Sequence, residues 1–359
     1  MTDPRIEEYA TLLVEECLDV QPGWQVMVSG GALARPLIES VFRLLARKGA
    51  YAIPRISLAG QGFNLVWAQE APLELLDNPS PIEMHPFHEA DAWIGIEAPE
   101  NTRELTALDQ ERLGRLQAGI RPHVERVFTF DMKWVGCQYP TAALAQEAGM
   151  SLTEFEDFLY GSCLLDWKAE KERMSTYAKA FDEAKEVRIV AEGTDLTLSV
   201  DGREGEVDAG GANMPGGEFF YSPLEDSASG TIAFTEFPAV YAGREVTGIR
   251  LRFEEGRVVD ASADSNESFL LETLDLDDGS RRLGELGIGC NPRITRHMKN
   301  TLFDEKIDGT VHLALGNGLP EVGGKNVSQV HWDIVKDLRD GGRIELDGKV
   351  VQESGKWTV

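Results

Sequence analysis

The chain has 359 residues, of which 42% are hydrophobic and 27% charged, and its formal net charge is −26 at pH 7. So acidic a protein is not expected to bind nucleic acids or anionic membranes, because both partners call for basic residues. No apolar run approaches the roughly 20 residues that cross a bilayer, and the acidic N-terminus does not resemble a signal peptide. We therefore expect a cytoplasmic protein. Its four widely spaced cysteines predict reduced thiols rather than a disulfide framework.

Helix and strand patterns alternate through the first half of the sequence. Apolar residues at helical spacing mark the segments 4–20, 36–48 and 109–117. Short apolar runs that are typical of strands are 24–29, 50–58, 90–96 and 124–130. We expect Ser29-Gly30-Gly31 to form a turn that ends the first of these strands. The alternation predicts a parallel sheet with helices on its faces.

Helices are expected to continue from residue 141 to residue 184. They should begin near Thr141, Ser151 and Trp167, and Glu154, three residues after Ser151, completes a capping-box pattern. The pattern changes near residue 186, where a domain boundary is expected. The predicted fold class is α/β, with a parallel α/β sandwich and helical connector in residues 1–185 and a mainly β (α+β) metal-binding domain in residues 186–359.

The second half is expected to consist mainly of strands. Alternating segments separated by Gly and Asp-Gly turns are 187–191, 196–200, 230–234 and 248–253. We expect one helix among them, at 267–276, and a C-terminal hairpin, 342–351, that turns at Asp347-Gly348.

Histidine is scarce in this chain, so each one is a candidate for chemistry. The six are His85, His88, His123, His297, His312 and His331. His331 and Asp333 lie two residues apart on a predicted strand, where such positions share a face, and together they suit a divalent ion such as Zn²⁺, Co²⁺ or Mn²⁺. His312 lies on a second apolar strand, and its pattern fits either a hydrogen-bonded core residue or a metal ligand.

Several carboxylates accompany these histidines in the C-terminal half. Glu218 follows Gly and Pro in a tight turn beside aromatic residues, and Glu285 lies among Leu, Ile and Gly, where burial is costly unless the carboxylate is paired or metal-bound. Asp304-Glu305 precedes His312. Two metals held by such groups can polarise a carbonyl and generate hydroxide near neutral pH, while a nearby glutamate moves the proton. Solvent-facing turns remain the alternative for Glu218 and for Asp304-Glu305.

The order of these motifs resembles that of the thermophilic aminopeptidases, a leucyl-aminopeptidase-like metallopeptidase family that includes aminopeptidases T and S. The similarity extends over about residues 139–337. The segments that carry it are 139–141, 145–150, 213–223, 283–285, 302–305, 312–316 and 326–333.

This resemblance implies a metal-dependent aminopeptidase that hydrolyses N-terminal residues from short peptides and is a homodimer. It implies two divalent metal ions (Zn, Co, Mn or Mg) as cofactors. The metal ligands implied are Glu218, Glu285, His312, His331 and Asp333, and Glu305 is implied as the general acid/base.

The chain departs from the family in the segment after His312. Family members carry a tyrosine there that helps to polarise the scissile carbonyl, but residues 316–321 contain none. Tyr221, Tyr241 and Lys325 are the candidates to replace it.

Two other functions remain open. Dihydroxypyridine ring-cleaving dioxygenases resemble the same family, and an Fe(II) ion held by two histidines and one carboxylate (His312, His331 and Asp333) would suit that chemistry. In that case His85, His88 or His123 could bind the substrate or transfer protons, although we expect all three to be ordinary surface histidines. The third alternative is a non-catalytic relative that binds metal or peptide. The presence of both Glu218 and Glu285 favours the peptidase with two metals.

Overall fold

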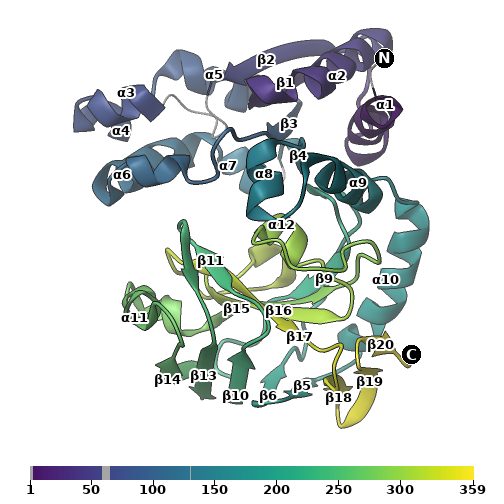
Figure 1. Ribbon diagram of the computed structural model, residues 1–359, viewed down its shortest axis with the longest axis vertical. Helices are drawn as coiled ribbons and strands as arrows, with labels where there is room; N and C mark the ends of the chain where they lie inside the picture. Colours follow the sequence, from purple (N-terminus) through teal and green to yellow (C-terminus); the bar gives the residue numbers. More distant parts are fainter. Residues whose placement is uncertain (1–2, 59–64, 130) are drawn as a thin grey trace. The chain divides into compact units, whose positions relative to one another are not determined.

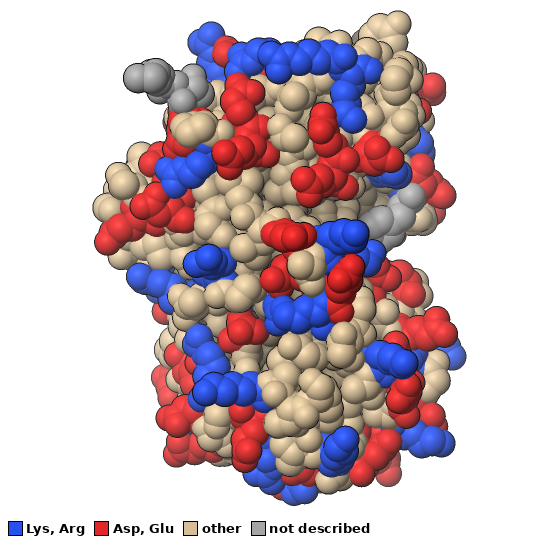
Figure 2. Space-filling view, turned by 90° about the vertical axis from the view of Figure 1, so that its right-hand side faces the viewer, with Lys and Arg blue, Asp and Glu red and all other residues tan. Residues whose placement is uncertain are grey.

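The computed structural model describes residues 3–58, 65–129 and 131–359. The chain forms two compact units: Met1–Leu164 with Gly210–Pro215, and Leu165–Ala209 with Gly216–Val359. No helix in the described ranges is long and apolar enough to span a membrane. On the face drawn in Figure 2, acidic side chains are widespread and interspersed with Lys and Arg.

The first unit is built around a parallel sheet. Its strands are β1 (Gln25–Gly31), β2 (Tyr51–Ser57), β3 (Ala92–Glu97), β4 (Lys133–Gln138) and β8 (Asn213–Met214), in the order β2-β1-β3-β4-β8 (Figure 1). Its helices are α1 (Pro4–Thr11), α2 (Arg35–Lys48), α3 (Leu65–Glu70), α4 (Leu73–Asp77), α5 (Pro81–Glu89), α6 (Gln110–Ile120), α7 (Glu125–Phe128), α8 (Ala142–Glu147) and α9 (Leu152–Cys163). The parallel α/β architecture expected for this part of the chain is confirmed.

Local signals account for several of these helices. Asp109 caps α6 by accepting a hydrogen bond from the backbone N–H of Arg112, and Ser151 with Glu154 forms the expected capping box at the start of α9. At the end of α2, Gly49 adopts a left-handed conformation with φ of 75°, which glycine does without strain. The predicted helix 4–20 is α1 followed by a π-helical stretch, Leu12–Cys17.

The strand predicted at 124–130 is wrong over its described residues, because Glu125–Phe128 is helical and the next strand, β4, begins at Lys133. Residue 130 lies outside the described residues. Val124 and Val127, three positions apart, both pack against one cluster that includes Phe87. That spacing fits a helical turn, and a run this short does not separate helix from strand.

The turn predicted at Ser29-Gly30-Gly31 is also wrong, since β1 continues through Gly31. Gly30 pairs with Ile96 of β3, and a Cβ atom at Gly30 would lie only 3.1 Å from the Ile96 carbonyl oxygen. The glycine therefore permits close approach within the sheet.

The second unit contains antiparallel sheets. The larger one, in the order β14-β13-β10-β6-β5-β18-β19-β20, consists of β5 (Glu186–Ala191), β6 (Thr194–Ser199), β10 (Ser229–Phe234), β13 (Ile249–Glu254), β14 (Arg257–Ser262), β18 (Arg343–Leu346), β19 (Lys349–Glu353) and β20 (Lys356–Trp357). The smaller one, in the order β17-β16-β15-β9-β7, consists of β7 (Glu206–Asp208), β9 (Glu218–Tyr221), β15 (Leu283–Gly289), β16 (Thr310–Gly316) and β17 (His331–Asp337). Further elements are the hairpin β11 (Ala239–Tyr241) and β12 (Arg244–Val246), the helices α10 (Trp167–Asp182), α11 (Glu267–Leu274) and α12 (Thr301–Asp304), and the 3-10 helices Asp278–Arg281 and Pro320–Val322.

The β-rich character, the helix near 267 and the terminal hairpin agree with expectation. Asp347 and Gly348 form the hairpin turn with φ of 47° and 80°. Cys17, Cys137, Cys163 and Cys290, all within the described residues, form no disulfide bonds, as expected.

Helix α10 belongs to the second unit, whereas the sequence-based division at 185/186 grouped it with the first. The reason is its apolar face: Met174, Ala178 and Phe181 are buried in the same core cluster as residues of the larger and the smaller sheet of the second unit. The short segment Gly210–Pro215 returns to the first unit because β8 pairs with β4.

The two faces of the smaller sheet differ sharply. One face carries apolar side chains such as Leu286, Leu313 and Trp332 into the core of the second unit. On the other face the register aligns charged residues with small ones: Glu285 lies opposite Ala314, Ala314 opposite Asp333, and Gly289 opposite Glu218. This second face carries the candidate site.

Candidate metal centre

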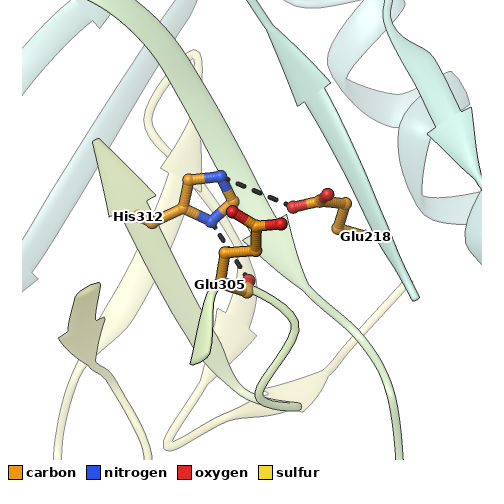
Figure 3. A group of neighbouring side chains, drawn as sticks. All are labelled: Glu218, Glu305 and His312. Atoms are coloured by element: carbon orange, nitrogen blue, oxygen red, sulfur yellow. Dashed lines mark hydrogen bonds and ion pairs between the residues drawn. The ribbon is translucent and has the colours of Figure 1, made fainter. Parts of the chain in front are cut away.

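All six residues predicted for the site come together on this face of the smaller sheet. Glu218 opens β9, Glu285 lies within β15, His312 within β16, and His331 and Asp333 lie on β17. Glu305, the residue that follows α12, reaches the same place. The side chains form two groups whose donor atoms lie within 4.8 Å of one another: Glu218, Glu305 and His312 (Figure 3), and Glu285, His331 and Asp333.

Glu285 connects the two groups. Its Oε1 lies 3.3 Å from His312 Nε2, and its Oε2 lies 3.2 Å from His331 Nε2. Glu218 Oε2 lies 3.5 Å from His312 Nε2, and Asp333 Oδ1 lies 3.6 Å from His331 Nε2. Each imidazole therefore faces Glu285 and one further carboxylate. A carboxylate shared in this way has the position needed to bridge two ions.

Backbone carbonyls orient both imidazole rings. His312 Nδ1 donates to the carbonyl oxygen of Glu305 at 3.1 Å, and His331 Nδ1 donates to that of Asn317 at 2.9 Å. Such bonds direct the other ring nitrogen, Nε2, towards the carboxylates. The sequence carried no signal for Asn317 in this role, because only its main chain takes part.

Gly287 provides the space in which the His312 ring lies. The two residues are register partners on β15 and β16, and a Cβ atom at Gly287 would stand 2.0 Å from His312 Nε2. Any other residue here would overlap the imidazole. Gly287 is thus a determinant of the site that the sequence analysis did not identify.

The residues present fit divalent cations. Glu218 Oε2 and Asp333 Oδ1 are buried side-chain oxygens without a hydrogen-bond partner among the described residues, which is costly unless a cation satisfies them. Carboxylate oxygens and imidazole nitrogens are donors that Zn²⁺, Co²⁺ and Mn²⁺ accept.

The ionisation of the site follows from burial and from these contacts. Burial alone would raise the pKa of Glu285, but hydrogen bonds from His312 and His331 outweigh it and hold the pKa at about 2. Burial likewise opposes charge on the histidines, yet the neighbouring carboxylates raise the pKa of His312 to about 10 and that of His331 to about 12. Both imidazoles therefore hold protons that a metal ion would displace on binding.

Glu305 behaves in the opposite way to Glu285. Burial raises its pKa to about 8, although the charge of Lys306 acts in the other direction. Lys306, which the sequence analysis did not single out, is fully buried, and its Nζ contacts both Glu218 and Glu305. Its only signal in the sequence was its position next to Glu305.

Asp304, the partner of Glu305 in the predicted carboxylate pair, has a structural role. Its two oxygens accept hydrogen bonds from the backbone N–H groups of Met298 and Asn300, and its Oδ2 lies 3.1 Å from His297 Nε2. Burial raises its pKa to about 7. These contacts fix the loop that leads into α12.

The three candidates for the missing tyrosine differ in position. The Tyr221 hydroxyl points to the opposite face of the sheet, where it donates to Ala178 and contacts Asp182, so it is not available to the site. Tyr241 stacks on Trp332 beside β17, with ring centroids 5.3 Å apart. Lys325 is exposed in the loop before β17.

The histidines considered for the dioxygenase alternative belong to the first unit. His88 Nε2 and His123 Nδ1 lie 2.9 Å apart and form a hydrogen bond with each other. His85 is exposed.

Comparison with known proteins places these features in context. Among curated proteins, the chain is 26% identical to aminopeptidase 2 of Geobacillus stearothermophilus, covering 99% of this chain and 98% of the relative. It is 27% identical to aminopeptidase AmpS of Bacillus subtilis, covering 98% of both, and 25% identical to aminopeptidase T of Thermus thermophilus, covering 99% and 98%.

Solved structures share the fold. Wild-type AmpT of Thermus thermophilus aligns with a TM-score of 0.87 at 22% identity and covers 99% of both chains. The 2,5-dihydroxypyridine dioxygenase of Pseudomonas putida KT2440 aligns with a TM-score of 0.64 at 15% identity and covers 100% of this chain and 98% of its own. The sequence model of the thermophilic metalloproteases (M29) matches residues 2–357, and the chain therefore belongs to this metalloprotease family.

Proposed function

We propose that the protein is a metal-dependent aminopeptidase that removes N-terminal residues from short peptides at a site for two divalent ions (Zn, Co, Mn or Mg). The observation that carries the proposal is the position of Glu285, whose two oxygens face the imidazoles of His312 and His331. Membership of the metalloprotease family and full-length similarity to proteins named aminopeptidases support it.

The residues divide naturally between two ions. Glu218 and His312 would hold one ion, His331 and Asp333 the other, and Glu285 would contact both. Ions bound in this way polarise a peptide carbonyl and lower the pKa of water towards neutrality.

Glu305 is the group that moves protons in this proposal. Its carboxyl group lies within the cluster of donor atoms that includes Glu218 and His312, and its burial favours the protonated form, which suits a group that takes up and releases a proton. It takes a proton from the attacking water and returns it to the leaving amine. Its backbone carbonyl at the same time keeps the His312 ring in place.

Metal analysis combined with a peptide assay tests the proposal. The purified protein, loaded with Co²⁺ or Zn²⁺, should hold two ions per chain and hydrolyse leucyl or aromatic dipeptides. His331→Ala should lose at least one ion, because Glu285 and Asp333 would lose their shared imidazole partner. His85→Ala, an exposed histidine of the first unit, is the matched control and should keep both ions.

Other outcomes would point to the other functions. One iron per chain, no peptide cleavage and O₂ uptake with a dihydroxypyridine would replace the peptidase with the dioxygenase. Two tightly bound ions without turnover of either substrate class would indicate a binding protein. Unchanged metal stoichiometry in His331→Ala would remove that residue from the ligand set.

The proposal also includes a homodimer, which rests on the family resemblance, and the cytoplasmic location that is expected from the sequence. Sedimentation of the metal-loaded protein tests the oligomeric state, and a monomer at micromolar concentration would contradict it. The net charge of −26 argues against nucleic acids and anionic membranes as partners.

A further inference from the structure

Lys306 is an ammonium group buried between two carboxylates of the site. Its side chain is 0% exposed, and its Nζ lies 3.0 Å from Glu218 Oε1 and also contacts Glu305 Oε1. A buried lysine is costly unless its charge is paired. The two contacts provide that pairing, and both reach groups assigned to the reaction.

The position of Glu305 is compatible with two roles. Its carboxylate lies beside the His312 imidazole on the side of Glu218, and one donor atom from each of the three residues falls within a 4.8 Å cluster (Figure 3). Glu305 is therefore placed either to bind an ion or to move protons. These roles exclude each other, because a carboxylate bound to an ion is a poor proton acceptor.

The contacts of Lys306 distinguish the oxygens of the two glutamates. On Glu218 the ammonium group contacts Oε1, whereas Oε2, which has no hydrogen-bond partner in the part of the chain that the structure describes, faces His312 Nε2 at 3.5 Å. On Glu305 the ammonium group contacts Oε1. Lys306 thus leaves Glu218 Oε2 directed at the imidazole and holds the Glu305 carboxylate by its own charge.

The main chain around Lys306 is fixed on both sides. Its N–H donates to the carbonyl of Phe303 at 3.0 Å, and its carbonyl accepts from the N–H of Asn291 at 2.9 Å. The Glu305 carbonyl accepts from His312 Nδ1. The backbone is thus held in place, and the ammonium group of Lys306 contacts the Glu305 side chain directly.

We propose that Lys306 is a positioning residue that holds Glu305 away from the ion at Glu218 and His312, so that Glu305 remains free to move protons. The proposal rests on the proposed two-metal aminopeptidase. It assigns Lys306 no contact with substrate.

Lys306→Met tests this directly, because methionine fills similar space without a charge. Glu305 should then turn to the ion near His312. Two Co²⁺ ions per chain should be retained, and their visible absorption should weaken as the coordination number rises. The value of kcat should fall by about 100-fold or more, as for loss of a general base, while KM changes by only about threefold.

The double variant Glu305→Gln/Lys306→Met separates positioning from general structural damage. It removes the carboxylate that would turn towards the ion, so its Co²⁺ spectrum should return to that of the wild type. Loss of an ion from Lys306→Met, or a Co²⁺ spectrum that stays altered in the double variant, would overturn the proposal.

If Lys306→Met does not fold, the single variant Glu305→Gln tests whether Glu305 is a metal ligand while Lys306 is present. The proposal expects both Co²⁺ ions and the wild-type spectrum in this variant, because Glu305 is not a ligand while Lys306 is present. A lost ion or a changed spectrum would show that Glu305 ligates in the wild type. These spectra do not depend on peptide cleavage, so a wild-type protein that binds two Co²⁺ ions without cleaving peptides would contradict only the proposed function.

Discussion

Gly287 shows how the smallest residue can determine a metal site. A Cβ atom at this position would lie 2.0 Å from both Cε1 and Nε2 of His312. Gly287→Ala should therefore displace the imidazole and remove the ion near His312, with a matching loss of activity. Metal content per chain and a thermal unfolding curve would measure this, and the protein should still fold because the core face of β15 is untouched.

Ile288→Val is the matched control on the same strand. Ile288 points to the opposite face and is fully buried in the core. Removing one methylene there should lower the free energy of unfolding by about 0.5–1.5 kcal/mol and leave the metal content unchanged. If Gly287→Ala retained both ions, the ring of His312 would not be held as described.

Residues of the site differ in how far the sequence could reveal them. His331 and Asp333 could be predicted to share a face because strand periodicity is a local property, and β17 places them so. Gly287 and Lys306 act through contacts between strands and between a loop and the sheet. Such contacts depend on register and chain path, which single-residue patterns do not encode.

Elements with strong local signals were the ones that could be predicted. Helix α9 has a capping box at Ser151, and the C-terminal hairpin has Asp-Gly at its turn. The segment 124–130 had only a short apolar run, and its tertiary contacts select a helical turn there. Where local preference is weak, packing decides the element.

Asp277, at the N-cap of the short 3-10 helix Asp278–Arg281 that follows α11, helps to anchor the loop between β16 and β17. Asp277 accepts hydrogen bonds at 2.8 Å from Ser328 Oγ and from the backbone N–H of Gln329, two residues before His331. Burial would raise its pKa, but these bonds outweigh it and keep the pKa below the usual 3.8. The stability that Asp277 contributes is therefore present above pH 3.8 and lost as the pH falls through the lowered pKa.

Asp277→Asn should expose this contribution. Urea unfolding at neutral pH should show that the free energy of unfolding falls by about 1 kcal/mol, which is below the roughly 1.5–3 kcal/mol typical of hydrogen bonds to charged groups because the side chain is partly exposed. The difference in the free energy of unfolding between this variant and the wild type should disappear at pH values below the usual aspartate pKa of 3.8. Asp278→Asn, a neighbouring carboxylate with a 90% exposed side chain, is the control and should change little. If the difference in the free energy of unfolding did not vary with pH, the stability of the loop would not depend on the charge of Asp277.

At the scale of the whole molecule, the sequence changes from alternating helices and strands to mainly strands. This change predicts two structural units, but it does not predict at which residues each unit begins and ends. Helix α10 has an apolar face, yet nothing in that pattern tells which sheet covers it. The return of Gly210–Pro215 to the first unit also has no local signal, because β8 contributes only two residues, Asn213 and Met214, to its sheet. Limits of this kind depend on long-range packing.

Two fragments test where the second unit begins. In the structure, α10 buries Met174 and Phe181 against the β-rich core, and Tyr221 donates to the carbonyl of Ala178. Each large side chain should contribute about 1.5–3 kcal/mol, a large share of a typical stability of about 5–15 kcal/mol. A fragment of residues 165–359 should therefore unfold cooperatively in urea, and one of residues 186–359 should not. Phe181→Ala in the longer fragment should lower its midpoint without removing cooperativity, because the rest of α10 still packs. Equal unfolding curves for both fragments would return the boundary to residue 186, since α10 would then add nothing to the core that it covers.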